Sequence, residues 1–322
     1  KAETSAAMRT FGELAEADIA RETAKLKRGK EVESYVRRYL LPEWRNRPLT
    51  SLRRRDAVRL LDRQVDAGRE PTALKLHEII VRIFNWAAAR DEIEASPFTS
   101  LKPPASKEPR QRALGHDEIK TLWAAWDELG YPWGPLHKLL LLTGQRRGEV
   151  AAMRWSELDD PADPREWHIP AERAKSKRPH LVPLSGPATE LLRSLPRFRH
   201  GDHVFSTTGG DRPVGGFSKA KGRIDAEAGR LSAEEGYPVV EPWRAHDLRR
   251  TLRTEMARLG ISDAVAERVL NHAGDQLVRT YNVHHYEEEK RRALEAWATE
   301  LNRLLGLAAT PQNVVTLSEV SG

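Results

Sequence analysis

The sequence predicts a mainly α-helical protein with a small β-sheet, arranged as two domains. Apolar residues recur at helical spacing over most of the chain, and only two short segments have the pattern of strands. A proline-rich basic stretch separates the N-terminal third from the rest. The chain has 322 residues, which is enough for two domains of ordinary size.

The N-terminal third is expected to form a helical bundle over residues 10–95. One of its helices is predicted to begin at Thr50 and Ser51 and to end at Gly68, a residue type that favours helix ends. The next helix carries an apolar stripe from Ile79 to Ala87, at the spacing of a helix side that packs into a core.

We place the first domain at residues 1–100, a linker at 101–112, a second domain at 113–305 and a C-terminal tail at 306–322. The second domain is expected to contain most of the helices and both strands. The strands are predicted at Trp167–Ile169 and Leu181–Leu184, and the helices at residues 116–128, 136–143, 217–229, 247–259, 262–271 and 286–305.

The charge is distributed unevenly. Residues 1–110 hold 23 Lys and Arg against 17 Asp and Glu, whereas residues 111–322 hold 30 of each, so the whole net charge of +6 lies in the first part. A basic module joined to a neutral one favours polyanion binding by the first and chemistry in the second. A chance imbalance on a solvated surface is the alternative.

Composition excludes several classes of protein. The chain has no cysteine, so it has neither a disulfide framework nor a thiolate metal site. No apolar run approaches the roughly 20 residues of a membrane-spanning helix. We therefore expect a cytoplasmic protein without a membrane partner.

Four segments together provide two arginines, a lysine, two histidines and a tyrosine. Cations of this kind can bind a phosphodiester, proton carriers can flank it, and a phenol can attack it. The segments are TGQRRGEV at 143–150, AKSKRPHLVPLS at 174–185, HDLRRT at 246–251 and LNHAGDQLVRTYNVHHY at 270–286.

Two arginines stand in contexts that predict fixed positions. Arg146 follows an apolar helix and should lie at a turn, and Arg249 follows His246 by three residues on the same side of a helix. Guanidinium groups present a fork of donors to phosphate oxygens and keep their charge. Because the sequence has no evident carboxylate cluster for Mg²⁺, we predict no metal and no cofactor.

Two tyrosines are candidates for the nucleophile. Tyr281 and Tyr286 both lie downstream of His272, and either phenol needs cationic neighbours or a base to attack at neutral pH. A phosphotyrosine would conserve the energy of the broken linkage, so a strand could be rejoined without ATP. Lys175, in the turn between the strands, is a candidate general acid for the leaving 5′-oxygen.

Each segment also has an ordinary structural interpretation. TGQRRG can be a joint between helices, HDLRRT can be a helix start capped by Asp247, and Lys175 with Lys177 can be a solvated turn. The adjacent His284 and His285 are weak evidence for a metal. Only a shared chemistry explains all four segments together.

The four segments resemble those of the tyrosine recombinase, or phage integrase, family. The resemblance covers roughly residues 110–305 with specific motifs, and residues 10–95 more loosely as the helical SAM-like core-binding domain of that family. It implies a catalytic domain after the linker. The catalytic residues that it implies are Arg146, Lys175, His246, Arg249, His272 and Tyr281, with Glu149 as a supporting acidic residue. Tyr281 is preferred to Tyr286 because the family's tyrosine follows the second histidine by nine residues.

The resemblance also implies a site-specific recombinase that integrates or excises a mobile element. Its partners would be double-stranded DNA attachment sites, a homotetramer on synapsed DNA, an excisionase and a DNA-bending host factor. A type IB topoisomerase and a non-catalytic DNA-binding regulator are the alternatives. Expected DNA contacts, beside Lys177 in the second domain, are Lys25, Lys27, Arg28, Lys30, Arg53, Arg54 and Arg55. Such integrases usually carry a further N-terminal domain for arm-type DNA sites, which we expect this chain to lack.

Overall fold

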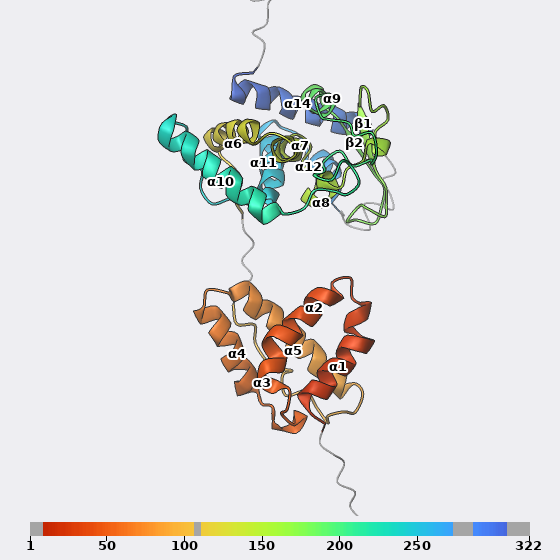
Figure 1. Ribbon diagram of the computed structural model, residues 1–322, viewed down its shortest axis with the longest axis vertical. Helices are drawn as coiled ribbons and strands as arrows, with labels where there is room; N and C mark the ends of the chain where they lie inside the picture. The colour runs from red at the N-terminus through yellow and green to blue at the C-terminus, as the bar shows by residue number, and fades with distance from the viewer. Residues whose placement is uncertain (1–8, 106–110, 273–285, 308–322) are drawn as a thin grey trace, which may run out of the picture. The chain divides into compact units, whose positions relative to one another are not determined.

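The computed structural model describes residues 9–105, 111–272 and 286–307 and divides into two units, Lys1–Pro109 and Arg110–Gly322 (Figure 1). Helices account for most of the described residues, and a single pair of strands forms the only described sheet. The predicted fold class, mainly α with a small β-sheet, is confirmed.

The first unit consists of helices alone among its described residues. Helix α5 lies in the middle of this unit in Figure 1, with α4 on one side and α1 and α2 on the other. Its elements are α1 (Phe11–Arg21), a turn of 3-10 helix (Thr23–Lys25), α2 (Gly29–Tyr35), a π turn (Val36–Leu40), α3 (Leu41–Trp44), a second 3-10 turn (Leu49–Ser51), α4 (Arg54–Asp66) and α5 (Glu70–Ala88).

An aromatic cluster fills the core of the first unit. Phe11 packs edge-on against Trp44, with ring centroids 5.4 Å apart, and Phe84 packs edge-on against Phe98 at 4.6 Å. All four side chains are buried. Phe98 therefore belongs to the core of this unit although it lies after the last helix of the bundle.

Helix α4 begins later than we predicted from Thr50 and Ser51. Those residues belong to the 3-10 turn, and Leu52 is extended and fully buried. The helix starts at Arg54 because the Asp56 carboxylate accepts a hydrogen bond of 2.8 Å from the Arg53 amide and so caps its first turn. The predicted end is confirmed, since Gly68 follows the helix with φ at +67°.

The second unit carries the remaining helices around a small sheet. Its elements are α6 (His116–Leu129), α7 (Trp133–Thr143), α8 (Arg147–Ala151), a 3-10 turn (Trp155–Glu157), β1 (Glu166–Ile169), β2 (His180–Pro183), α9 (Gly186–Arg193), α10 (Phe217–Glu234), α11 (Ala245–Arg258), α12 (Asp263–Val269) and α14 (Glu287–Leu305). Arg112, in the predicted linker, donates to the Pro242 carbonyl at 3.0 Å and so belongs to this unit.

Helix α7 is the central element of the second unit. Nearly all of its side chains are buried, and helices α6, α9, α11 and α14 pack against it (Figure 1). The Trp297 indole of α14 donates to the Leu141 carbonyl at 3.0 Å, which ties the C-terminal helix to the end of α7. Because α7 is held on all sides, the residues that follow it have a fixed position.

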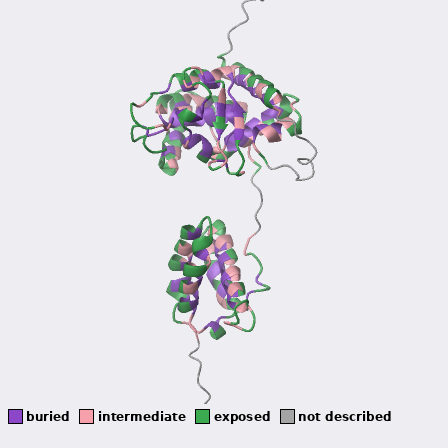
Figure 2. Cartoon of the chain, turned by 90° about the vertical axis from the view of Figure 1, so that its right-hand side faces the viewer, coloured by how far each residue is buried: buried purple, intermediate pink, exposed green. Residues whose placement is uncertain are grey.

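The two strands form the hairpin that the sequence predicted. They pair in antiparallel register, with Trp167 opposite Val182 and Ile169 opposite His180. Trp167 and Val182 are buried, so this pair joins the helical core. In both units, buried residues gather in the interior and exposed residues lie on the outside (Figure 2). Residues 170–179 connect the strands and contain the candidate lysines.

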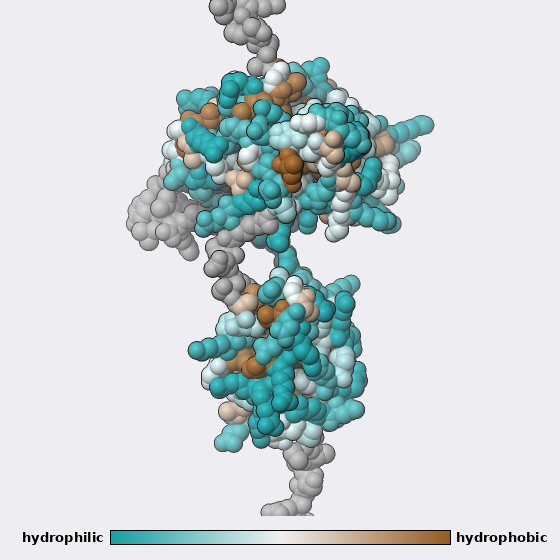
Figure 3. All heavy atoms as spheres, turned by 90° about the vertical axis from the view of Figure 1, so that its left-hand side faces the viewer, coloured by the Kyte–Doolittle hydropathy of each residue, from teal (hydrophilic) through white to brown (hydrophobic). Residues whose placement is uncertain are grey.

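The surface of both units is largely hydrophilic on the face seen in Figure 3, with small hydrophobic patches. Among the residues that the structure describes, no helix combines the length and the apolar content that a bilayer crossing requires.

Candidate active site

The first candidate residue, Arg146, stands where α7 gives way to α8. Gly144 ends α7 in the left-handed conformation, with φ at +64°, and a Cβ there would lie 3.0 Å from Leu270 and 3.1 Å from Leu252. Glycine at this position therefore lets the chain turn tightly against the core. Arg146 follows as the residue that precedes α8, and about a fifth of its side chain is exposed. The prediction that Arg146 lies at a turn is confirmed.

Glu149 connects Arg146 to the strand hairpin. Its buried carboxylate accepts from the Arg146 amide at 3.2 Å and from Arg146 Nη1 at 3.3 Å. The same carboxylate accepts from the Lys175 amide at 3.0 Å. One buried acid thus fixes the backbone of both cationic residues, an arrangement that suits the supporting role predicted for it.

Arg249 is held more deeply than Arg146. It lies on α11, only 3% of it is exposed, and Nη1 donates to the Gly144 carbonyl at 2.7 Å. Nη2 donates to the Leu270 carbonyl at the end of α12. Burial, with the nearby charge of Arg146, lowers the pKa of Arg249 to about 10, so the group is still a cation at neutral pH.

The connection between the strands presents Lys175 to solvent. The Lys175 side chain is exposed, and its ammonium makes no hydrogen bond or ion pair to another described residue. Lys177 is also exposed and has φ at +58°. The backbone of Lys175 is fixed by Glu149 while its side chain is available for another molecule.

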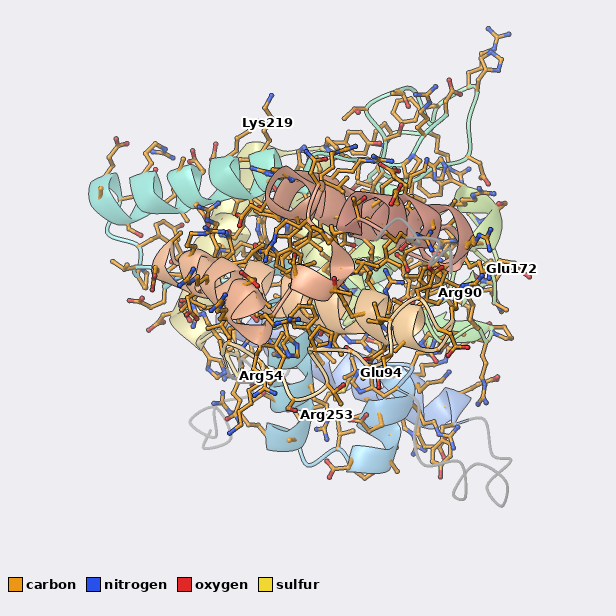
Figure 4. All side chains as sticks on the ribbon, turned by 90° about the horizontal axis from the view of Figure 1, so that it is seen from below. Arg54, Arg90, Glu94, Glu172, Lys219 and Arg253 are labelled. Carbon is orange, nitrogen blue, oxygen red and sulfur yellow. The ribbon has the colours of Figure 1, made fainter. Side chains whose placement is uncertain are left out.

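His272 is oriented by a carboxylate. Its Nδ1 lies 2.5 Å from Glu267 Oε2, and the other oxygen of Glu267 accepts from Arg253 Nε at 3.1 Å. Arg253 lies on α11 (Figure 4). Burial alone would raise the pKa of Glu267, but the bonds from His272 and Arg253 lower it overall. An ionised Glu267 can only accept, so Nδ1 carries the proton and Nε2 faces away from the carboxylate.

Both candidate histidines have lowered pKa values. Burial, followed by the charges of Arg250 and Arg249, lowers the pKa of His246. Burial, followed by the charge of Arg249, also lowers the pKa of His272, although Glu267 opposes the shift. The neutral imidazoles are therefore favoured at neutral pH, and each can accept a proton.

Five of the six predicted catalytic residues lie in one neighbourhood. Arg146 donates to the Asn271 carbonyl at 3.3 Å, next to His272, and the charge of Lys175 is near enough to His246 to contribute to lowering its pKa, after burial and the two arginines. The sixth residue, Tyr281, lies outside the described residues, as do His284 and His285. Tyr286 is described and precedes α14, with the Arg268 guanidinium 5.2 Å from its ring centre.

Sequence reasoning missed residues that support the site. Glu267 precedes His272 by five residues, a spacing that carries no motif. Asn271 has φ at +49° and donates from its amide to Ser176 Oγ at 3.0 Å, which links the end of α12 to the strand connection. The only feature of the sequence that could have pointed to Asn271 is its position next to His272. No group of three or more metal-ligating side chains occurs within the described ranges.

The predicted DNA contacts of the first unit differ from the predicted catalytic residues in how they are held. All seven are exposed. Lys25 pairs with Glu22 at 3.0 Å, and Arg28 lies 3.7 Å from Glu31. Arg54 stands at the start of α4 (Figure 4). None of them is fixed by a buried partner, so no local contact distinguishes them from other surface cations.

Comparison with known proteins places both units in one family. The Phage integrase family matches residues 112–288, and the Phage integrase central domain matches residues 11–103. Prophage integrase IntZ of Escherichia coli K12 is 26% identical over 293 residues, which cover 88% of this chain and 68% of IntZ. The integrase of Escherichia phage HK022 is 24% identical over 73% of this chain and 64% of its own length. The chain thus spans about two thirds of the length of these relatives.

Solved structures share the fold. A lambda integrase tetramer bound to a Holliday junction has a TM-score of 0.65 at 19% identity, covering 83% of this chain and 79% of that one. A Tn1549 transposon integrase in complex with circular intermediate DNA has a TM-score of 0.65 at 14% identity, covering 89% and 99%. The chain therefore belongs to the phage integrase family, and the prediction of a site-specific recombinase of the tyrosine class is confirmed.

Proposed function

We propose that this chain cleaves and rejoins DNA strands at a specific site through a 3′-phosphotyrosine at Tyr281, and so integrates or excises a mobile element. One observation carries the proposal. Arg146 and Arg249 are both fixed by protein partners beside His272 and the strand connection of Lys175. Fixed cations beside proton carriers suit the attack of a phenol on a phosphodiester.

In the proposed step the Tyr281 oxygen forms a bond to phosphorus as the bond from phosphorus to the 5′-oxygen breaks. Lys175 gives a proton to the departing oxygen, which leaves as a hydroxyl. Arg146 and Arg249 hold the non-bridging oxygens, on which negative charge accumulates in the transition state. Rejoining is the reverse step, with a 5′-hydroxyl as the nucleophile.

We assign His272 as the base that accepts the proton of the attacking phenol. Its Nδ1–H points at Glu267, which leaves the lone pair of Nε2 as the acceptor. The lowered pKa keeps this imidazole neutral at the pH of the reaction. His246, on α11 before Arg249, then serves as a donor to the phosphate.

The proposed partners follow from the relatives. The neighbouring structures include a lambda integrase dimer bound to a core site and a tetramer bound to a Holliday junction. By analogy, this chain would bind double-stranded attachment sites and act as a homotetramer in the bacterial cytoplasm. An excisionase and a DNA-bending host factor would set the direction of the reaction. The exposed cations of the first unit would bind DNA phosphates.

A nicked suicide substrate tests the proposal. The substrate is a duplex with the attachment sequence that flanks the gene, nicked so that the released fragment diffuses away and the covalent intermediate accumulates. We expect a covalent adduct on a denaturing gel with the unaltered chain and none with Tyr281→Phe.

Tyr286→Phe is the matched control, because it removes a phenol from the same segment of the chain. It should form the adduct at a rate close to that of the unaltered chain. An adduct that persists in Tyr281→Phe and disappears in Tyr286→Phe would reject Tyr281 as the nucleophile, and mass spectrometry of the tryptic conjugate would locate the linkage directly.

A further inference from the structure

A buried ion pair lies beside the strand connection and has no part in the proposed chemistry. Arg173 donates from Nε and from Nη2 to the two oxygens of Glu157, each at 2.5 Å. The side chains are only 16% and 8% exposed. A two-point pair of this kind fixes direction as well as distance, since both partners are planar.

Glu157 is itself anchored to the sheet. It ends the 3-10 turn Trp155–Glu157, and its Oε2 accepts from the indole of Trp167 on β1 at 2.9 Å. Arg173 also donates from Nη1 to the backbone carbonyl of Glu149 at 3.3 Å. Arg173 is therefore bound to the core of the unit on two sides, two residues before Lys175.

The strand connection continues from Arg173 into a ring of hydrogen bonds. The Lys175 amide donates to Glu149, and Ser176 Oγ accepts from Asn271. Asn271 accepts from Arg146, and Arg146 donates to Glu149, which closes the ring. The ring fixes the backbone at Lys175 and Ser176 by linking it to Arg146 and Glu149.

The chain before Lys175 has fewer supports. The amides of Arg173 and Ala174 donate to the Pro170 carbonyl at 3.1 and 3.0 Å, and Ala174 is buried. Glu172 is exposed and makes no hydrogen bond or ion pair to another described residue. Apart from the buried methyl group of Ala174, the side chain of Arg173 is thus the main attachment of this half of the connection to the rest of the unit.

We propose that Arg173 and Glu157 are positioning residues for Lys175: their buried pair sets the place from which the lysine delivers its proton to the leaving 5′-oxygen. The inference rests on the proposed role of Lys175 as general acid. Without the pair, the connection would keep the ring at Ser176 but lose its attachment before the lysine. A displacement of about 1 Å of a catalytic group can cost on the order of a hundredfold in rate.

A substrate with sulfur in place of the bridging 5′-oxygen separates positioning of the acid from other effects. In that DNA the bond from phosphorus to sulfur breaks and the sulfur leaves as a thiolate. A thiol has a pKa of about 8.5, so its anion departs without a proton donor. A variant whose defect is proton delivery is slow on ordinary DNA and fast on the sulfur-containing DNA.

The variants are Arg173→Leu and the double variant Glu157→Leu/Arg173→Leu, measured by single-turnover cleavage on both substrates. The double variant removes both buried charges, so it avoids the unpaired carboxylate that the single change leaves behind. Arg165→Leu is the matched control, because Arg165 makes an exposed pair with Asp163 at 2.9 Å. Lys175→Ala shows how far the sulfur substrate restores the rate when the proposed general acid itself is removed.

We expect Arg173→Leu and the double variant to be slowed about 10- to 100-fold on ordinary DNA and to come within about threefold of the unaltered chain on the sulfur substrate. Arg165→Leu should match the unaltered chain on both. Equal slowing of the Arg173 variants on the two substrates, or no slowing on either, would overturn the inference.

Failure of the underlying assignment gives a different result. If Lys175→Ala is not rescued by sulfur, Lys175 is not the general acid, and the positioning role falls with it. If Lys175→Ala is rescued and the Arg173 variants are not, only the positioning role is wrong. If Arg173→Leu does not fold, as judged by its thermal unfolding midpoint, the double variant decides the question.

Discussion

The two predicted catalytic arginines of the second unit are held by protein partners, whereas the predicted DNA-contact cations of the first unit are not held by buried partners. Arg146 and Arg249 bond to carbonyls and a carboxylate that belong to the protein. Lys27, Lys30 and Arg54 lie in solvent without such partners among the described residues. A group that is already held in place loses little freedom when it meets a phosphate, whereas a mobile side chain must be ordered first.

This difference predicts that the two groups of cations have different functions. Fixed cations can stabilise charge that develops during the reaction, because they need not reorganise. Exposed cations contribute to DNA affinity through counterion release, and each contributes modestly. Substitutions in the two regions should therefore affect different measurements, and by different amounts.

The largest effect is expected for Arg249→Lys. A lysine keeps the charge but cannot bond to the carbonyls of Gly144 and Leu270 and also present a fork to the phosphate. We expect single-turnover cleavage of the suicide substrate to fall about 10²- to 10³-fold. DNA binding, measured by fluorescence anisotropy, should change by less than about threefold, because one phosphate contact in several is altered.

Arg250→Lys is the control for this change. Arg250 is the next residue on α11, with about a third of its side chain exposed, and it pairs with the fully buried carboxylate of Asp247 at 2.9 Å. Its substitution should slow cleavage by no more than a few fold. Equal losses in the two variants would mean that burial and bonds to backbone carbonyls do not set Arg249 apart from its neighbour.

A smaller effect is expected for Glu267→Gln. The carboxylate raises the pKa of His272 against the larger effect of burial, so its loss lowers that pKa further. The rate should fall at acid pH, where His272 is protonated and cannot accept a proton. In the variant this fall, the acid limb of the rate profile, should move to lower pH. The rate at neutral pH should fall about tenfold, because a glutamine no longer selects the Nδ1–H tautomer.

The measurement is the pH dependence of single-turnover cleavage between about pH 5 and pH 9. Glu288→Gln, in an exposed position at the start of α14, is the control and should leave the profile unchanged. A shift of the acid limb to higher pH in Glu267→Gln would contradict the assignment of His272 as the proton acceptor.

The candidate site was easier to predict from the sequence than the residues that support it. Arg146, Glu149, His246 and Arg249 were found because their segments have local patterns, and the structure brings these segments together as the resemblance implied. Arg173 and Glu157 carry no such pattern. Their pairing joins residues that lie 16 positions apart in the sequence, and only the folded chain shows that they meet.

The accuracy of the prediction also differed between helices and strands. The apolar α7 and the alternating strands have strong periodic signals, and both were predicted near their observed places. The start of α4 was wrong by a few residues, because polar side chains cap helices from several neighbouring positions. Contact with DNA depends on how the surface of the protein docks on a duplex. The sequence around an exposed cation such as Arg54 does not indicate whether that cation contacts DNA.

A still smaller effect is expected for Arg54→Ala. Loss of one phosphate contact should reduce the slope of log affinity against log salt by about one unit and weaken binding a few fold. Cleavage of bound DNA should be unchanged. Arg63→Ala is the control, because Arg63 pairs with Glu43 and should not affect the slope. An Arg54 variant with a normal slope would remove this residue from the DNA surface.

Chelation should have the least effect. In the proposed mechanism Arg146 and Arg249 supply the charge that a metal ion supplies in other phosphoryl-transfer sites, and the described part of the second unit holds no cluster of metal ligands. Cleavage of the suicide substrate should therefore proceed at the same rate, within about twofold, in EDTA and in Mg²⁺ at matched ionic strength. Matched ionic strength is essential because salt alone weakens DNA binding. A loss of cleavage in EDTA that Mg²⁺ restores would mean that fixed guanidinium groups do not suffice, and the contrast between the two classes of cation would lose its physical basis.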